Sequence, residues 1–260
     1  MTTNPIELTI ANGVATVLIN RPERKNALSV AAFNGLADAW DQIETNPDIR
    51  VAILTSADCG VFCAGLDLKE ATQIARDEGV DILSKARDPF FDRMRDCSKP
   101  IISAMTGSLM AGGMMLTLMS DLRVGLKGTK AGITEVKVGR GSPWAAPGLS
   151  MLPQPILMEM VLTGDLMPIE RLQEYGFINY LENTPDAVRT RARALADRIA
   201  SGAPLSVIAA KASVRATMDL GCKAGLAEGK RLHEVVYASE DAIEGPRAFA
   251  EKRPPVWTGS

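Results

Sequence analysis

Hydrophobic and polar positions follow two different patterns along the chain, strand-like in the first half and helical in the second. Short apolar runs typical of strands occupy residues 6–10, 14–19, 51–55, 101–104 and 122–124. The Asn12–Gly13 pair between the first two runs favours a tight turn. The first two strands are therefore expected to form a hairpin.

Apolar residues at helical spacing predict helices between these strands and throughout the second half. After Ser29, which can cap a helix, apolar side chains recur every three or four positions as far as Ile43. We expect helices at 30–44, at 68–76 and in a methionine-rich stretch between 113 and 120. The second half shows helical patterns only, at 154–163, 168–175, 185–201, 204–220, 223–239 and 241–251.

This order of elements predicts an α/β fold. Strands that alternate with helices imply a mostly parallel sheet with right-handed crossovers. A chain of 260 residues can bury a sizeable core in one domain. We expect residues 1–200 to form that core and residues 201–260 to form a helical C-terminal extension.

Composition and charge argue against several classes of function. A net charge of -2 is unlike the basic surface expected for binding nucleic acid or an anionic membrane. The chain starts without a signal-peptide pattern, has no apolar stretch long enough to span a membrane, and its four cysteines show no CxxC spacing. A reduced, cytoplasmic protein is expected. The single histidine, His233, removes multi-histidine metal sites, and we predict a structural role for it.

Two loops of small residues carry the most specific pattern, at residues 61–68 (VFCAGLDL) and 107–115 (GSLMAGGMM). Each follows an apolar run and precedes a helical stretch. Small residues there allow close backbone approach, so we expect the N–H groups of Ala64 and Gly112 to point at one place. Two such donors make an oxyanion hole, which stabilises negative charge as it develops on a carbonyl oxygen.

In these two segments the chain resembles the enoyl-CoA hydratase/isomerase (crotonase) family. The resemblance extends from Val14 to Lys252. It implies a core of repeated ββα units, an acyl-CoA thioester substrate and an enolate held by the N–H groups of Ala64 and Gly112. Coenzyme A is then part of the substrate, so no metal and no separate cofactor are expected.

Glu135 is the candidate acid/base, in the segment Ala131-Gly-Ile-Thr-Glu-Val-Lys-Val-Gly139. Its neighbours Ile133 and Val136 are apolar, and a desolvated carboxyl has a raised pKa. From the residues alone an exposed loop carboxylate is an alternative. The resemblance favours Glu135 as the catalytic group, because it falls on the family's acid/base glutamate.

Met115 departs from the family pattern at the position that decides the reaction. Typical hydratases of the family carry a second glutamate three positions after the second oxyanion glycine, where this chain has Met115. A thioether neither donates nor abstracts a proton. Hydration by one glutamate, isomerisation of a 3-enoyl to a 2-enoyl thioester, and other enolate chemistry all stay open. We rank hydration first, isomerisation second, and a non-catalytic acyl-CoA-binding protein after them.

The resemblance also assigns residues to substrate binding and to assembly. From the residues alone, Asp67 is interpreted first as the cap of the following helix, and Trp144 either lines the acyl pocket or packs its loop. The C-terminal residues of this set are expected to reach coenzyme A, often a neighbour's, within a homotrimer or a dimer of trimers. The set is Arg24, Lys25, Ala27, Leu66, Asp67, Leu68, Met115, Trp144, Phe249 and Lys252.

Overall fold

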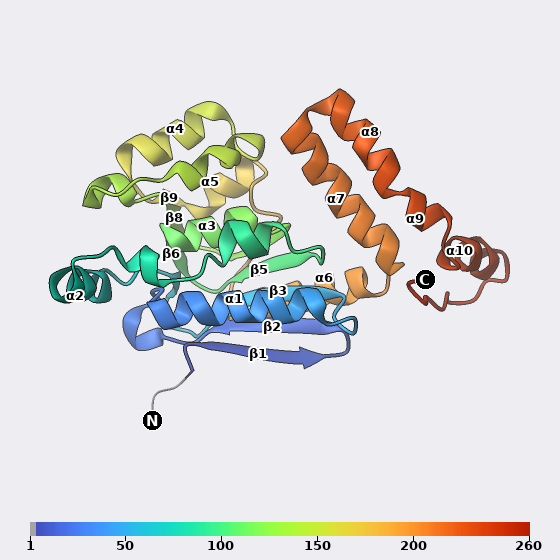
Figure 1. Cartoon of the computed structure of the whole chain (residues 1–260), viewed down its shortest axis with the longest axis horizontal. Coiled ribbons are helices and arrows are strands. Elements are labelled where there is room, and N and C mark those ends of the chain that lie inside the picture. Colours follow the sequence, from blue (N-terminus) through green and yellow to red (C-terminus); the bar gives the residue numbers. More distant parts are fainter. Residues whose placement is uncertain (1–3) are drawn as a thin grey trace.

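A six-stranded sheet forms the centre of the protein in the computed structural model, which describes residues 4–260 (Figure 1). Its order is β1-β2-β3-β5-β7-β10; β1 is antiparallel to β2, as the Asn12–Gly13 turn predicted, and all other neighbours are parallel. The strands are β1 (Ile6–Ala11), β2 (Val14–Ile19), β3 (Val51–Ser56), β5 (Ile101–Met105), β7 (Leu122–Leu126) and β10 (Tyr180–Glu182).

A second, four-stranded sheet of short strands holds the two small-residue loops. Its order is β4 (Val61–Cys63), β6 (Ser108–Met110), β8 (Lys130–Gly132) and β9 (Met167–Pro168). A long strand, a short strand and a helix follow one another twice, as β3-β4-α2 and β5-β6-α3, with α2 at Leu68–Glu78 and α3 at Gly112–Met119. The predicted α/β fold of ββα units is thereby confirmed.

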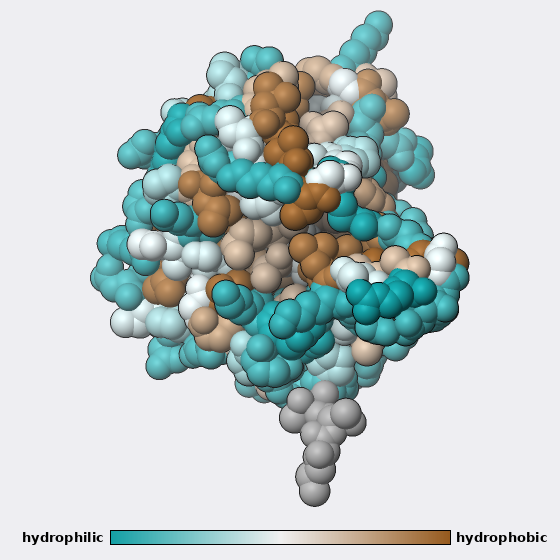
Figure 2. Space-filling view, turned by 90° about the vertical axis from the view of Figure 1, so that its left-hand side faces the viewer, coloured by the Kyte–Doolittle hydropathy of each residue, from teal (hydrophilic) through white to brown (hydrophobic). Residues whose placement is uncertain are grey.

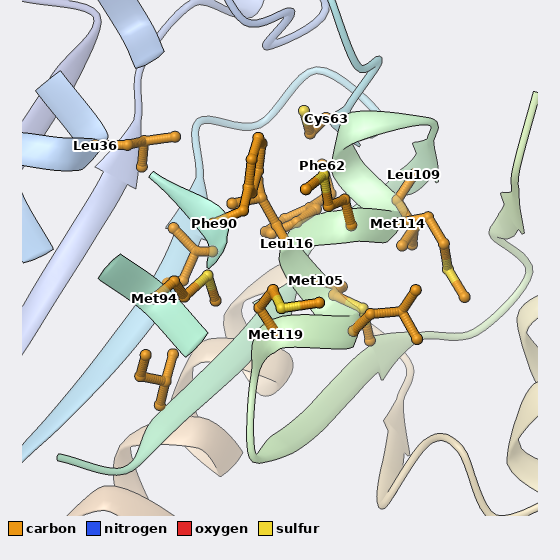
Figure 3. Packing of buried hydrophobic residues seen from close by; sticks show 14 of the residues in the cluster. Leu36, Phe62, Cys63, Phe90, Met94, Met105, Leu109, Met114, Leu116 and Met119 are labelled. Carbon is orange, nitrogen blue, oxygen red and sulfur yellow. The ribbon is translucent and has the colours of Figure 1, made fainter. Parts of the chain in front are cut away.

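Helices bury both faces of the large sheet. One core contains α1 (Val30–Thr45) and α3, and Met114 and Met119 of α3 are buried in the same cluster as Phe62 and Phe90 (Figure 3). On the opposite face, α6 (Pro185–Ala200) packs apolar side chains against β3, β5 and β7. All six residues of β3 are buried, which explains why the strand begins with an apolar run at residues 51–54 that shows no alternation. Ser29 caps α1 as predicted, its hydroxyl accepting the Ala32 N–H.

The C-terminal helices extend away from the sheet (Figure 1). They are α7 (Pro204–Leu220), α8 (Cys222–Leu232), α9 (Glu234–Tyr237) and α10 (Asp241–Ala250). Lys211 of α7 holds this extension to the core, its Nζ lying 2.8 Å from Asp121 Oδ2 and 2.6 Å from the Lys99 carbonyl. The predicted division at residues 200/201 falls between α6 and α7; independence of the two parts stays a prediction.

Most differences from the sequence prediction concern short elements. The two-residue β9 and three-residue β10 are too short to show alternation, and the helix predicted at 223–239 is divided at His233 into α8 and α9. The His233 ring contacts the Gly229 carbonyl and the Ser213 hydroxyl within the extension. The other helices are α4 (Gln154–Thr163), α5 (Ile169–Glu174), the 3-10 helices Pro22–Arg24, Ile82–Lys85, Glu135–Val138 and Pro143–Ser150, and a π-helix at Phe90–Arg95.

Two sequence predictions concern membranes and targeting. Across residues 4–260, each helix is too short or too polar to cross a bilayer. The prediction that the N-terminus is not a signal peptide rests partly on residues 1–3, which lie outside the described residues.

Candidate active site

The two small-residue loops meet at a pair of glycines. Gly65 follows β4 with a φ of +86°, in the left-handed region that favours glycine. A Cβ at Gly65 would lie 2.7 Å from the Ala111 Cβ and 3.1 Å from the backbone nitrogen of Gly112. The two backbones are therefore in contact, which the sequence predicted from the small residues of both loops.

The donors at this junction differ in part from the prediction. The Ala64 N–H does not point freely into the site, because it donates to the Lys25 carbonyl over 3.2 Å. Gly65 then turns the chain, and the next N–H, that of Leu66, meets no acceptor within residues 4–260. Gly112 is the first residue of α3, where a helix leaves its N–H groups unpaired. The free pair of donors is Leu66 and Gly112, so the prediction for Ala64 was wrong by two positions.

Glu135 lies at the start of a 3-10 helix with its carboxyl group buried. The residue is 8% exposed, and its Oε2 atom meets no hydrogen-bond donor in the described part of the chain. Burial raises the pKa of Glu135 above its ordinary value, although backbone donors, the Trp144 indole and the charge of Arg140 oppose this effect. The predicted direction of the pKa shift is confirmed, with desolvation as its cause.

One apolar cleft of about 960 Å³ brings these groups together. Met115 on α3 forms part of the apolar wall of the cleft, which Glu135 also lines. Figure 2, viewed from the side of α2, shows apolar surface in the middle of this face with hydrophilic side chains around it. The predicted site residues that line the cleft are Ala64, Leu66, Leu68, Gly112, Met115, Glu135 and Trp144.

Other wall residues were missed by sequence reasoning. Phe90 and Phe91 open the π-helix, where the Asp88 carboxylate accepts both of their N–H groups. Arg140 and Asp81 also line the cleft and form an ion pair with 2.9 Å between Nη2 and Oδ2. The Asp88–Pro89 pair before two phenylalanines is a helix-start signal that would have pointed to the first group. No local sequence pattern signals the Arg140–Asp81 ion pair, because the two residues are far apart in the sequence.

Residues 20–28 contact the loop of Ala64 but do not line the cleft. Asp67 caps α2, as predicted, and its carboxylate lies 2.7 Å from Arg24 Nη2 and 3.1 Å from Arg21 Nη2. Burial tends to raise the pKa of Asp67, but hydrogen bonds from Arg24, a backbone N–H and Arg21 outweigh it and lower the pKa. The Ala27 carbonyl accepts from Arg21. Lys25 is exposed and forms no ion pair within residues 4–260, so it is freer than Arg24 to meet an anion.

The C-terminal candidates do not reach this cleft within one chain. Phe249 is 87% exposed on α10, Lys252 follows it, and neither lines the cleft. In Figure 1 α10 and α2 lie at opposite ends of the molecule. A role for either residue at an acyl-CoA site therefore requires a second copy of the chain.

The fold is that of the crotonase class of α/β enzymes. A solved structure of enoyl-CoA hydratase from Mycobacterium tuberculosis H37Rv matches it with a TM-score of 0.87 and 35% identity, covering 99% of this chain and 100% of that one. The chain belongs to the enoyl-CoA hydratase/isomerase family, whose model matches residues 9–260, and it is an enzyme of that family.

Two curated relatives are hydratases by name. The (E)-benzylidenesuccinyl-CoA hydratase of Thauera aromatica is 36% identical over 260 residues, which is 98% of this chain and 100% of the relative. An enoyl-CoA hydratase of Mycobacterium tuberculosis is 36% identical over 245 residues, or 92% of this chain and 91% of the relative. Identity along the whole length is consistent with an acyl-CoA thioester as the substrate of this chain.

Proposed function

We propose that the protein is an enoyl-CoA hydratase that adds water to a 2-enoyl-CoA with Glu135 as its only acid/base. The observation that carries this proposal is the buried Glu135 carboxyl, whose Oε2 atom meets no donor in the described residues, in the same cleft as the free N–H groups of Leu66 and Gly112. The two hydratase relatives support hydration over other enolate reactions.

In the proposed mechanism the thioester oxygen accepts hydrogen bonds from the Leu66 and Gly112 N–H groups. The Glu135 carboxylate takes a proton from a bound water as the water oxygen attacks Cβ, and the π electrons move to the thioester oxygen as an enolate. The two donors stabilise this charge where it develops. Glu135 then returns the proton to Cα, so the net change is addition of H and OH.

The raised pKa of Glu135 suits both proton transfers, abstraction from the water and delivery to Cα. A carboxyl group with an ordinary pKa is an inefficient acid/base near neutral pH, because its pKa lies well below the operating pH. Desolvation moves Glu135 toward the operating pH. A single carboxyl group that first receives and then delivers a proton needs no second glutamate, which accounts for a thioether at Met115.

Isomerisation of a 3-enoyl-CoA to a 2-enoyl-CoA is the second candidate, and Met115 is the observation that favours it. Moving one proton from Cα to Cγ needs one base and no bound water, and Met115 leaves the cleft wall apolar where a second carboxylate would hold that water. The third alternative from the sequence, a non-catalytic acyl-CoA-binding protein, is not supported, because the chain belongs to a family of enzymes and its two relatives described above are hydratases by name.

The reaction is tested by adding the purified protein to crotonyl-CoA and, separately, to a 3-enoyl-CoA. Loss of the conjugated enoyl absorbance with crotonyl-CoA would support hydration, and gain of that absorbance with the 3-enoyl-CoA would support isomerisation. Saturable binding of both thioesters without turnover of either would contradict both proposed reactions.

We also propose that the coenzyme A site is completed by a second copy of the chain in a homotrimer or a dimer of trimers. Phe249 and Lys252 are exposed and remote from their own cleft, and apolar side chains such as Val235, Tyr237 and Ile243 are exposed on the same extension. Sedimentation velocity of wild type and Ile243→Glu tests this assembly. A wild-type monomer at micromolar concentration would contradict it.

A further inference from the structure

Arg140 keeps more free guanidinium donors than Arg87, the other arginine that lines the cleft. Arg87 donates through both terminal nitrogens to Asp38 and Asp41. The Asp88 carboxylate accepts the two N–H groups that open the π-helix. Arg140 pairs with Asp81 through Nη2 only, and its Nε and Nη1 donors have no acceptor within residues 4–260.

Asp81 holds this guanidinium in place. Its Oδ1 accepts the Leu83 N–H over 2.8 Å at the start of a 3-10 helix, and the same carboxylate accepts from Arg140 over 3.1 and 2.9 Å. The backbone N–H of Arg140 donates in turn to the Glu135 carbonyl over 3.0 Å. The orientation of Arg140 is thus fixed from two sides before any ligand arrives, and such preorganisation favours binding.

The rest of the nearby wall offers little to an anion. Leu66, Leu83, Val138 and Trp144 line the cleft with apolar surface. In such surroundings a ligand carboxylate without a partner would be strongly disfavoured, whereas one that meets Arg140 gains charge-assisted hydrogen bonds. The cleft therefore suits an acyl group with an apolar body and one anionic group.

We propose that Arg140 selects the substrate class by binding a free carboxylate on the acyl group, so that the preferred substrates are thioesters of dicarboxylic acids. This inference rests on the proposed function, since it places the acyl group of a CoA thioester in the cleft. Arg140 and Glu135 line the same cleft, so a carboxylate bound at Arg140 and the carbons that react at Glu135 would belong to one acyl group.

The test compares two saturated thioesters whose binding does not depend on turnover. Glutaryl-CoA carries the carboxylate, and 5-methylhexanoyl-CoA carries an isopropyl group of similar shape in its place. Calorimetric dissociation constants are measured for wild type, Arg140→Met and Arg140→Gln, of which the last keeps a donor for Asp81 without the charge. Lys137→Met is the control, because Lys137 is exposed on the same segment and pairs with Asp165 outside the cleft.

Loss of a charge-assisted hydrogen bond weakens binding by about tenfold to a hundredfold, so both Arg140 variants should bind glutaryl-CoA that much more weakly. Binding of 5-methylhexanoyl-CoA should change less than twofold, and Lys137→Met should match wild type for both ligands. Equal weakening of both ligands, or unchanged glutaryl-CoA binding, would overturn the proposal. Failure of the hydratase proposal would appear separately, as absent turnover of crotonyl-CoA and glutaconyl-CoA with selective binding retained.

Discussion

Gly65 lies against the backbone nitrogen of Gly112, so closely that a side chain at Gly65 would come within 3.1 Å of that nitrogen. The contact joins a loop after β4 to the first turn of α3, two segments that belong to successive ββα units. It also places the free Leu66 N–H next to the free Gly112 N–H. The register between these two units, and not any single side chain, sets the geometry of the proposed oxyanion hole.

Gly65→Ala tests this contact. Its φ of +86° disfavours an L-residue by about 1–2 kcal/mol, and the new methyl group would displace Ala111 and Gly112. We expect kcat for crotonyl-CoA to fall by about a hundredfold or more, because moving one oxyanion donor has effects of that size. Gly79→Ala is the matched control, since it has a φ of +71° with nothing near its Cβ. Equal losses of activity in both variants would show that backbone strain alone is responsible.

Glu135→Gln should abolish most turnover and leave binding intact. The amide has nearly the shape of the carboxyl group but cannot take or return a proton, and loss of an acid/base typically lowers kcat about 10²–10⁴-fold. Dissociation constants for a saturated acyl-CoA should stay within a few-fold of wild type. Glu174→Gln, at an exposed position on α5, is the control. A fully active Glu135→Gln enzyme would rule out Glu135 as the acid/base.

The same substitution should change how stability depends on pH. Because the folded-state pKa of Glu135 lies above its unfolded value of 4.5, the folded state binds more protons than the unfolded state between these two values. This contribution to the free energy of unfolding is fully present below pH 4.5 and is lost as pH rises through the folded pKa. Glu135→Gln should therefore lose less stability than wild type on going from pH 4 to pH 8, as measured by urea denaturation. Parallel pH profiles would contradict the assigned shift.

Much of the fold was predictable because its main elements are long or strongly patterned. Strand β3 is buried on both faces and begins with four apolar residues in a row, and α7 begins at Pro204 and ends at Leu220 as predicted. The second sheet was not predicted in the same way. Its strands have two or three residues each, too few for periodicity, and they form because the neighbouring ββα units hold them in register.

The two loops of the candidate site could be predicted from the sequence, but the particular N–H groups that are free could not. Small residues located both segments, yet which N–H is free depends on the turn at Gly65 and on the distant Lys25 carbonyl that accepts from Ala64. The carbonyl is brought there by tertiary structure, which no local pattern reports. The pair of Arg140 and Asp81 was hidden for the same reason.

Met115→Glu tests whether hydration is limited by the absence of a second carboxylate at this position. Met115 lines the cleft with Glu135 at 8% exposure, so a glutamate there would be partly desolvated and would face a second carboxylate. Two such groups can hold a water and divide proton abstraction from delivery. We expect hydration of crotonyl-CoA to rise severalfold or more, with Met115→Gln as the uncharged control. An equal rise in both variants would assign the effect to polarity, and a fall in Met115→Glu alone would favour the isomerase.

Lys211→Met tests whether the C-terminal extension is separable from the core. Lys211 Nζ donates to Asp121 and to the Lys99 carbonyl, and the side chain is buried between α7 and the end of the sheet. Hydrogen bonds of charged groups contribute about 1.5–3 kcal/mol each, so their loss should loosen α7. Hydrogen exchange should then accelerate in α7 and α8 while β3 and β5 stay protected, and the exposed Lys223→Met should show no change. Equal acceleration in the sheet would mean that core and extension unfold as one unit, which would contradict a boundary at residue 200.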